Sequence, residues 1–180
     1  AEGAEHEVSD KRMRARDLPS PFHGVRMPPG ATTMASLCAA RAARLPTHAA
    51  ISHASAAAVD GLPLPERMRR DRTVHVSVPT GFRAPQGRGT RGHQVSHRAQ
   101  DADRRHGFLC TTAARTFAIS LPDLTLGELV AVGGHILRMA LATRDELDDV
   151  AGRTGRRADG RACFLADLRV PSLADEMRPA

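Results

Sequence analysis

The chain has 180 residues, which is enough for one hydrophobic core or for one core with a small appended module. Its formal net charge is +6, and Lys11 is the only lysine, so arginine supplies nearly all of the positive charge. No run approaches the roughly 18 apolar residues of a membrane-spanning helix, and the acidic, polar amino end is unlike a signal peptide.

The arginine content has two interpretations. The planar guanidinium suits phosphates and guanine edges, which favours a nucleic acid as partner. A GC-rich genome would enrich arginine and alanine over lysine in the same way, without any partner. The charge alone therefore leaves both open.

The amino-terminal residues predict a short basic helix. Ser9 is a good N-cap, and Asp10 lies in the first turn, where the helix dipole favours a negative charge. A turn followed by a short basic helix is typical of a recognition helix, and the alternative is a solvated charged helix. On the first interpretation, four side chains of residues 9–16 contact DNA: Lys11, Arg12, Arg14 and Arg16.

Residues 18–30 predict a hairpin. Turn-forming residues surround Phe22, a short alternating strand runs to Met27, and Pro-Pro-Gly closes it. The hairpin is either a wing along a phosphate backbone, supported by Arg26, or an edge hairpin that packs Phe22 and Val25 into the core.

The central part of the chain predicts a helix followed by a strand, helix and strand. Residues 31–45 have apolar side chains at helical spacing, and Pro46 ends this helix. A short apolar segment at 49–52 leads into an alanine-rich helix at 54–59. After a charged stretch, the valines of 73–78 alternate with polar residues, as in a half-buried strand.

Four polar residues in this part could form a Ser/His catalytic pair: His48, Ser52, His53 and Ser55. A catalytic triad needs a nucleophile, a base and an orienting acid that the fold brings together. Because adjacency in sequence shows none of this, we favour Ser52 and Ser55 as caps of the short helix.

Residues 81–92 are rich in glycine and arginine. They have neither the spacing of a phosphate-binding Walker loop nor the strand-to-helix context of a dinucleotide fingerprint. The segment is either a flexible basic loop or a contact to a phosphate backbone.

Histidines near residue 100 raise the question of a metal. His93 and His97 share one face of a predicted strand, but they are roughly 13 Å apart at about 3.3 Å per residue. That separation is too large for one ion, even with His106 and either Asp101 or Asp103 nearby. We therefore predict no metal site and no cofactor.

The carboxyl-terminal half predicts mainly helices. Residues 101–107 form a hydrophilic turn, 108–111 a strand, and Thr112 caps the helix that follows. Capping boxes at Thr125 and Thr143 begin two further helices, the first to about residue 142 and the second to about 152. A last short helix covers 162–168.

The three cysteines are widely spaced in apolar surroundings. No pair has the spacing of a zinc knuckle or a redox dithiol, and an odd number argues against a disulfide scaffold. We expect buried thiols in a reducing cytoplasm.

An ordered set of segments resembles the actinobacterial AbiEi-type antitoxin and regulator proteins, and it covers nearly the whole chain. The segments are residues 8–18, 21–26 (PFHGVR), 51–57 (ISHASAA), 61–65 (GLPLP), 74–79 (VHVSVP), 92–93 and 111–116 (TTAART). In the last of these, Thr112-Ala113 stands where the family usually has Ser-Pro.

The resemblance implies an α+β fold in three parts. A partial winged helix or helix-turn-helix with a wing hairpin would occupy 1–30. An α+β domain would occupy 31–168, with a small mixed sheet packed with helices and a helical carboxyl-terminal portion. A loose tail would occupy 169–180. Two features depart from the family: Glu7 stands where a turn glycine is common, and most of the first helices of a complete winged helix have no counterpart in this sequence.

The function implied is a non-catalytic, DNA-binding transcriptional regulator of a type IV toxin-antitoxin system. Its expected partners are double-stranded DNA and a nucleotidyltransferase-like toxin. In many relatives a very-short-patch-repair-like endonuclease domain follows, and residues 171–178 resemble a degraded start of it. The alternatives are a truncated or divergent protein of that nuclease type and a protein-interaction module that binds a partner toxin.

Overall fold

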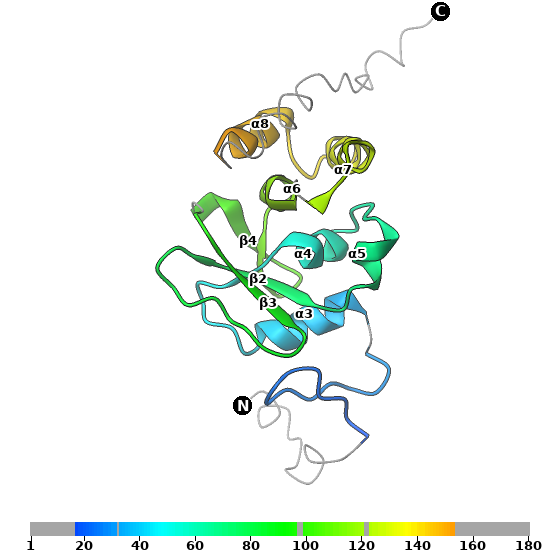
Figure 1. The fold of residues 1–180 in the computed structure, drawn as a ribbon, viewed down its shortest axis with the longest axis vertical. Helices are drawn as coiled ribbons and strands as arrows, with labels where there is room; N and C mark the ends of the chain where they lie inside the picture. Colours follow the sequence, from blue (N-terminus) through cyan, green and yellow to red (C-terminus); the bar gives the residue numbers. More distant parts are fainter. Residues whose placement is uncertain (1–16, 32, 97–98, 121–122, 154–180) are drawn as a thin grey trace, which may run out of the picture.

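A five-stranded mixed sheet forms the centre of the protein in a computed structural model that describes residues 17–31, 33–96, 99–120 and 123–153 (Figure 1). The strands are β1 (Ala50–Ile51), β2 (Val74–Pro79), β3 (Thr90–Val95), β4 (Ala102–Arg105) and β5 (Phe108–Thr111). Their order in the sheet is β3-β2-β1-β5-β4. The β2–β3 and β1–β5 pairs are parallel, and the β1–β2 and β4–β5 pairs are antiparallel.

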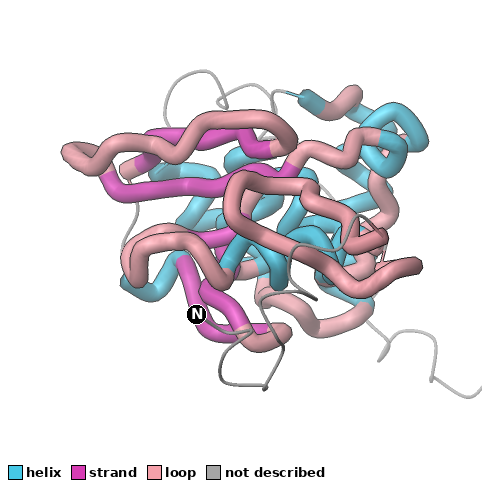
Figure 2. Tube along the Cα trace, turned by 90° about the horizontal axis from the view of Figure 1, so that it is seen from below, coloured by secondary structure: helices cyan, strands magenta, loops and turns pink. Residues whose placement is uncertain are grey.

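Six α-helices surround this sheet in the described part of the chain: α3 (Met34–Ala42), α4 (His53–Val59), α5 (Glu66–Arg70), α6 (Ala113–Ser120), α7 (Leu126–Arg138) and α8 (Arg144–Arg153). A 3-10 turn, Ala99–Asp101, precedes β4. Helices α6, α7 and α8 gather at one end of the molecule, and α3 lies toward the other (Figure 1). Figure 2 shows the strands and helices of the same fold from below. The predicted α+β class and the mixed sheet packed with helices are confirmed.

One hydrophobic cluster lies where β2 meets α3. Val74, Val76 and Val78 are fully buried on one face of β2, as their alternation predicts. Cys38 of α3 and Cys110 of β5 belong to the same cluster, and burial raises the pKa of each thiol to about 12. Both are therefore neutral structural thiols, as expected, while Cys163 lies outside the described residues.

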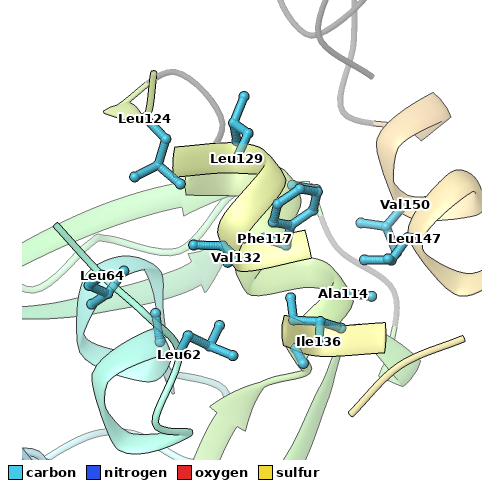
Figure 3. Packing of buried hydrophobic residues seen from close by; sticks show 13 residues of the cluster. Leu62, Leu64, Ala114, Phe117, Leu124, Leu129, Val132, Ile136, Leu147 and Val150 are labelled. Carbon is cyan, nitrogen blue, oxygen red and sulfur yellow. The ribbon is translucent and has the colours of Figure 1, made fainter. Parts of the chain in front are cut away.

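A second cluster forms around Phe117 of α6, which points between the two helices that follow it (Figure 3). Leu129, Val132 and Ile136 of α7 approach it from one side, and Leu147 and Val150 of α8 from another. The capping box predicted at Thr125 and Glu128 is present and begins α7. Thr143 and Glu146 make the equivalent bonds before α8.

Two predicted elements are wrong in the described residues, and one helix was not predicted. The stretch expected as a hydrophilic turn at 101–107 contains β4, which pairs along its whole length with β5. The charged stretch after Leu64 contains α5. The strand expected before Met27 does not form: residues 17–31 contain turns, closed by the bond from Met27 N to Pro19 O at 3.0 Å.

The amino-terminal segment, residues 17–31, packs apolar side chains into the core, as one of the two interpretations of the predicted hairpin stated. Phe22 and Val25 are buried and join the α3 cluster, while Arg26 is exposed. A wing built from a strand hairpin is therefore not found over 17–31. The basic helix predicted at 9–16 and the helix at 162–168 lie outside the described residues, as does the tail.

Among the described residues, no helix combines the length and the apolar character that crossing a bilayer requires.

Candidate functional site

Three histidines from three separate segments meet on one face of the sheet. His53 is the first residue of α4, His75 lies in β2, and His93 lies in β3. The parallel register pairs His75 with Arg91 and Ser77 with His93, so these side chains share the face opposite the buried valines. One ring nitrogen of each histidine lies within 4.8 Å of those of the other two. We call this group the histidine cluster.

The rings of the histidine cluster are in direct contact. His75 Nδ1 lies 3.1 Å from His93 Nε2, and the His53 ring stacks on the His93 ring with centroids 3.8 Å apart. His53 has a positive φ of 51°, a left-handed conformation that costs a non-glycine residue about 1 kcal/mol or more. The start of α4 therefore holds the His53 ring against the strands at a cost in backbone energy.

Three buried serines stabilise the histidine cluster through hydrogen bonds. Ser52 Oγ lies 3.0 Å from His53 Nδ1, and Ser77 donates a hydrogen bond of 2.7 Å to Ser52 Oγ. Ser55 Oγ accepts a 2.8 Å bond from the backbone N–H of His75 and donates to Thr73 O. All three serines are buried. They fix the position of the β2 backbone and of the His53 ring.

The electrostatics favour neutral imidazoles. Burial, together with the charges of the other two rings, lowers the pKa of His53 to about 3. Burial likewise lowers the pKa of His93 to about 4 and lowers the pKa of His75. Each ring is therefore neutral at pH 7, with one nitrogen that carries an N–H and one that has a lone pair.

Four charged side chains act on the histidine cluster from its surroundings. Arg91 of β3 and Arg115 of α6 are cations that disfavour additional positive charge there. The carboxylate of Asp71 opposes the effect of Arg91 on His75, and the carboxylate of Asp123 does so at both His75 and His93. The effects of the two arginines and the two carboxylates on the rings therefore partly cancel.

The sequence by itself indicated members of the histidine cluster but not the cluster. It placed Ser52 and His53 side by side, yet Ser52 is the N-cap of α4 without a side-chain capping bond, and Ser55 bonds to β2 instead of capping the helix. Among the histidines considered for a metal, His106 is exposed and contacts Asp60, while His97 lies outside the described residues. His75 was the missing member, and the register of β2 against β3 is the signal that identifies it.

A second feature is the basic loop between β2 and β3, residues 80–89. Gln86 Nε2 donates to Gly92 O at 3.0 Å, and Gln94 Nε2 donates to Phe82 O at 2.5 Å. The loop is therefore bonded along the outer edge of β3. Arg83, Arg88 and Arg91 are exposed, and no described carboxylate pairs with them.

Gly92 is the position where this loop comes closest to the strand. A Cβ at Gly92 would lie 2.1 Å from Pro85 O and 2.8 Å from Pro85 N, so any side chain must displace the loop. We expect Gly92→Ala to lower the free energy of unfolding by about 1–3 kcal/mol, measured by urea denaturation.

The matched control for this substitution is Gly127→Ala, in the first turn of α7, where a Cβ would meet nothing within 4 Å. Because alanine favours a helix over glycine, this variant should be unchanged or more stable by up to about 1 kcal/mol. Equal stability of the two variants would contradict the close contact at Gly92.

The amino-terminal segment lies against this basic loop. A Cβ at Gly89 would lie 3.3 Å from the Phe22 ring and 3.5 Å from Pro21 O. Arg41 stacks over the Phe22 ring and donates a 3.0 Å bond to Thr90 Oγ1. Of the residues predicted to contact DNA, Arg26 is exposed in this segment. The other four lie outside the described residues: Lys11, Arg12, Arg14 and Arg16.

In comparisons with known proteins, no family model, no curated protein and no solved structure matches this chain.

Proposed function

We propose that this chain is a non-catalytic regulator of the antitoxin type that binds double-stranded DNA in the cytoplasm. The observation that carries the proposal is a run of unbalanced positive charge. Residues 72–100 contain no aspartate or glutamate but hold Arg72, Arg83, Arg88, Arg91 and Arg98. A local excess of arginine of this kind attracts a phosphate backbone and raises the rate of association.

The shape of the loop supports the same proposal. The bonds from Gln86 and Gln94 hold the loop on the edge of β3, so Arg83 and Arg88 extend from an ordered base. Phe82 beside them is 46% exposed, with its ring 3.9 Å from the His48 ring between centroids. The segment that follows the basic residues 11–16 packs next to this loop at Gly89. DNA bound at the loop would therefore lie close to the described amino-terminal residues around Phe22.

The proposal is tested with the full chain and a fluorescent duplex in a salt series. We expect Arg83→Ala with Arg88→Ala to weaken binding about tenfold or more at low salt, because two phosphate contacts are lost. The slope of log K against log salt should fall in magnitude by roughly 2. Replacing Arg12 and Arg14 with alanine should weaken binding further.

The control removes the same charge elsewhere. Arg69 and Arg70 are exposed on α5, but both pair with Glu66. Replacing these two with alanine should leave the duplex affinity within about twofold, because they lie outside the basic loop and the shared Glu66 carboxylate offsets part of their charge. Equal losses in the two double variants would mean that only net charge matters, and salt-independent binding would refute the proposal. Cleavage of the duplex in Mg²⁺ would refute the non-catalytic part and favour the nuclease-type alternative.

A nucleotidyltransferase-like toxin remains the second proposed partner, on the strength of the resemblance in sequence. Met139 and Leu141, after the end of α7, are large exposed apolar side chains of the kind that a protein partner covers. Co-purification with the product of the adjacent gene, and its loss when both residues are changed to serine, tests this.

A further inference from the structure

We propose that His53, His75 and His93 together bind one divalent transition-metal ion, and that Zn²⁺ is an ion that suits this donor set. Neutral imidazole nitrogens are preferred ligands of Zn²⁺, Cu²⁺ and Ni²⁺, whereas Mg²⁺ and Ca²⁺ require oxygen ligands. Three protein ligands would leave the fourth position of a tetrahedral ion to a small ligand or water.

The spacing of two ring nitrogens already matches such a site. Two ligands bound at about 2.1 Å to a tetrahedral Zn²⁺ lie about 3.4 Å apart. His75 Nδ1 and His93 Nε2 are 3.1 Å apart. In the metal-free protein this distance is accommodated by an N–H···N bond between the rings. An ion would take the place of the proton between these two nitrogens, and the donating ring would stay neutral by carrying its N–H on its other nitrogen.

The third ligand is oriented by the buried serines. When His53 Nδ1 carries its proton, it donates to Ser52 Oγ at 3.0 Å, and the Nε2 lone pair is left for the metal. A metal-bound histidine usually donates its other ring N–H to an acceptor in this way. One ring nitrogen from each histidine lies within 4.8 Å of the other two, which is wider than a bound ion requires, so one ring must move inward on binding.

The charged side chains around the histidine cluster partly offset one another. Arg91 and Arg115 oppose a cation, and the carboxylates of Asp71 and Asp123 offset part of that repulsion.

The test titrates ZnCl₂ into the full chain after treatment with EDTA and desalting, with isothermal calorimetry as the readout. We expect one zinc per chain, and no binding of Mg²⁺ by the same three residues. His53→Gln, His75→Gln and His93→Gln should each weaken the zinc affinity by roughly 100-fold or more, and Ser52→Ala by about tenfold.

The matched controls are His23→Gln and His135→Gln, which replace histidines outside the cluster and should leave the affinity unchanged. Zinc binding that is absent in the wild type, or equal in the three cluster variants and the controls, overturns the proposal.

A second measurement needs only the wild-type protein and decides the case in which a variant fails to fold. Long-range ¹H–¹⁵N spectra report the protonation and metal binding of each imidazole ring. Zinc should shift the ring nitrogens of His53, His75 and His93 together at one equivalent, and leave those of His135 unchanged. Unchanged spectra for the three rings overturn the proposal.

Discussion

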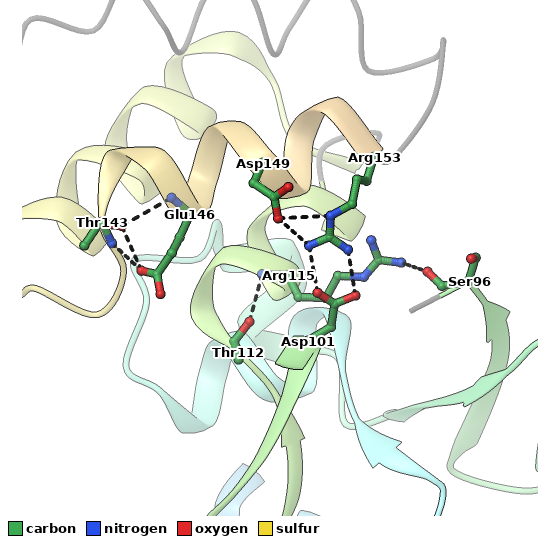
Figure 4. Close-up of polar contacts among 8 residues, drawn as sticks. All are labelled: Ser96, Asp101, Thr112, Arg115, Thr143, Glu146, Asp149 and Arg153. Atoms are coloured by element: carbon green, nitrogen blue, oxygen red, sulfur yellow. Dashed lines mark hydrogen bonds and ion pairs between the residues drawn. The ribbon is translucent and has the colours of Figure 1, made fainter. Parts of the chain in front are cut away.

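Replacing Asp101 with alanine is expected to lower the free energy of unfolding by about 3 kcal/mol, measured by urea denaturation. The Asp101 side chain is 1% exposed and accepts two bonds from the Arg153 guanidinium, at 2.9 and 3.0 Å (Figure 4). Buried Arg115 also interacts electrostatically with Asp101, and it donates to Ser96 O at 2.6 Å. The substitution therefore removes the carboxylate that Arg115 and Arg153 share where α6 packs against α8.

Asp149→Ala is the control for this prediction, because it removes a second carboxylate from the same arginine. Asp149 lies 2.9 Å from Arg153 Nη2, but its side chain is 51% exposed. Solvent screens such a pair, so we expect a loss below about 1 kcal/mol. If both variants lost the same stability, the buried position of Asp101 would not be the cause.

Phe117→Ala is expected to have the largest effect of any single truncation considered, about 3–5 kcal/mol of unfolding free energy. Phe117 is 1% exposed and contacts side chains from α7 and α8 (Figure 3). Removing the ring leaves a cavity that these helices cannot close without losing their own contacts. Met139→Ala, at a side chain that is 61% exposed, should change the stability by less than about 0.5 kcal/mol. A small loss for Phe117→Ala would contradict its place at the centre of the cluster.

The sequence by itself determined the elements whose signals are local. The alternating valines predicted β2, and capping boxes at Thr125 and Thr143 located the starts of α7 and α8. The alanine-rich run predicted α4. These signals act within a few residues, through side-chain period and helix capping, so no knowledge of neighbours was needed.

Elements that depend on a partner could not be predicted. The sequence of β4, Ala-Asp-Arg-Arg, has no apolar alternation, and its strand conformation comes from pairing with β5 at the edge of the sheet. The strand expected before Met27 does not form because it lacks such a partner. In the described structure, no neighbouring strand pairs with residues 17–31.

Only the tertiary structure decided which polar residues meet. His53, His75 and His93 are separated by 22 and 18 residues in sequence, and along one strand the histidines at 93 and 97 are too far apart for one ion. The parallel register of β2 and β3, with α4 beginning beside them, brings the three rings within 4.8 Å. Pairing of this kind depends on how distant segments pack, because the side-chain period gives the face of each strand but not its neighbour.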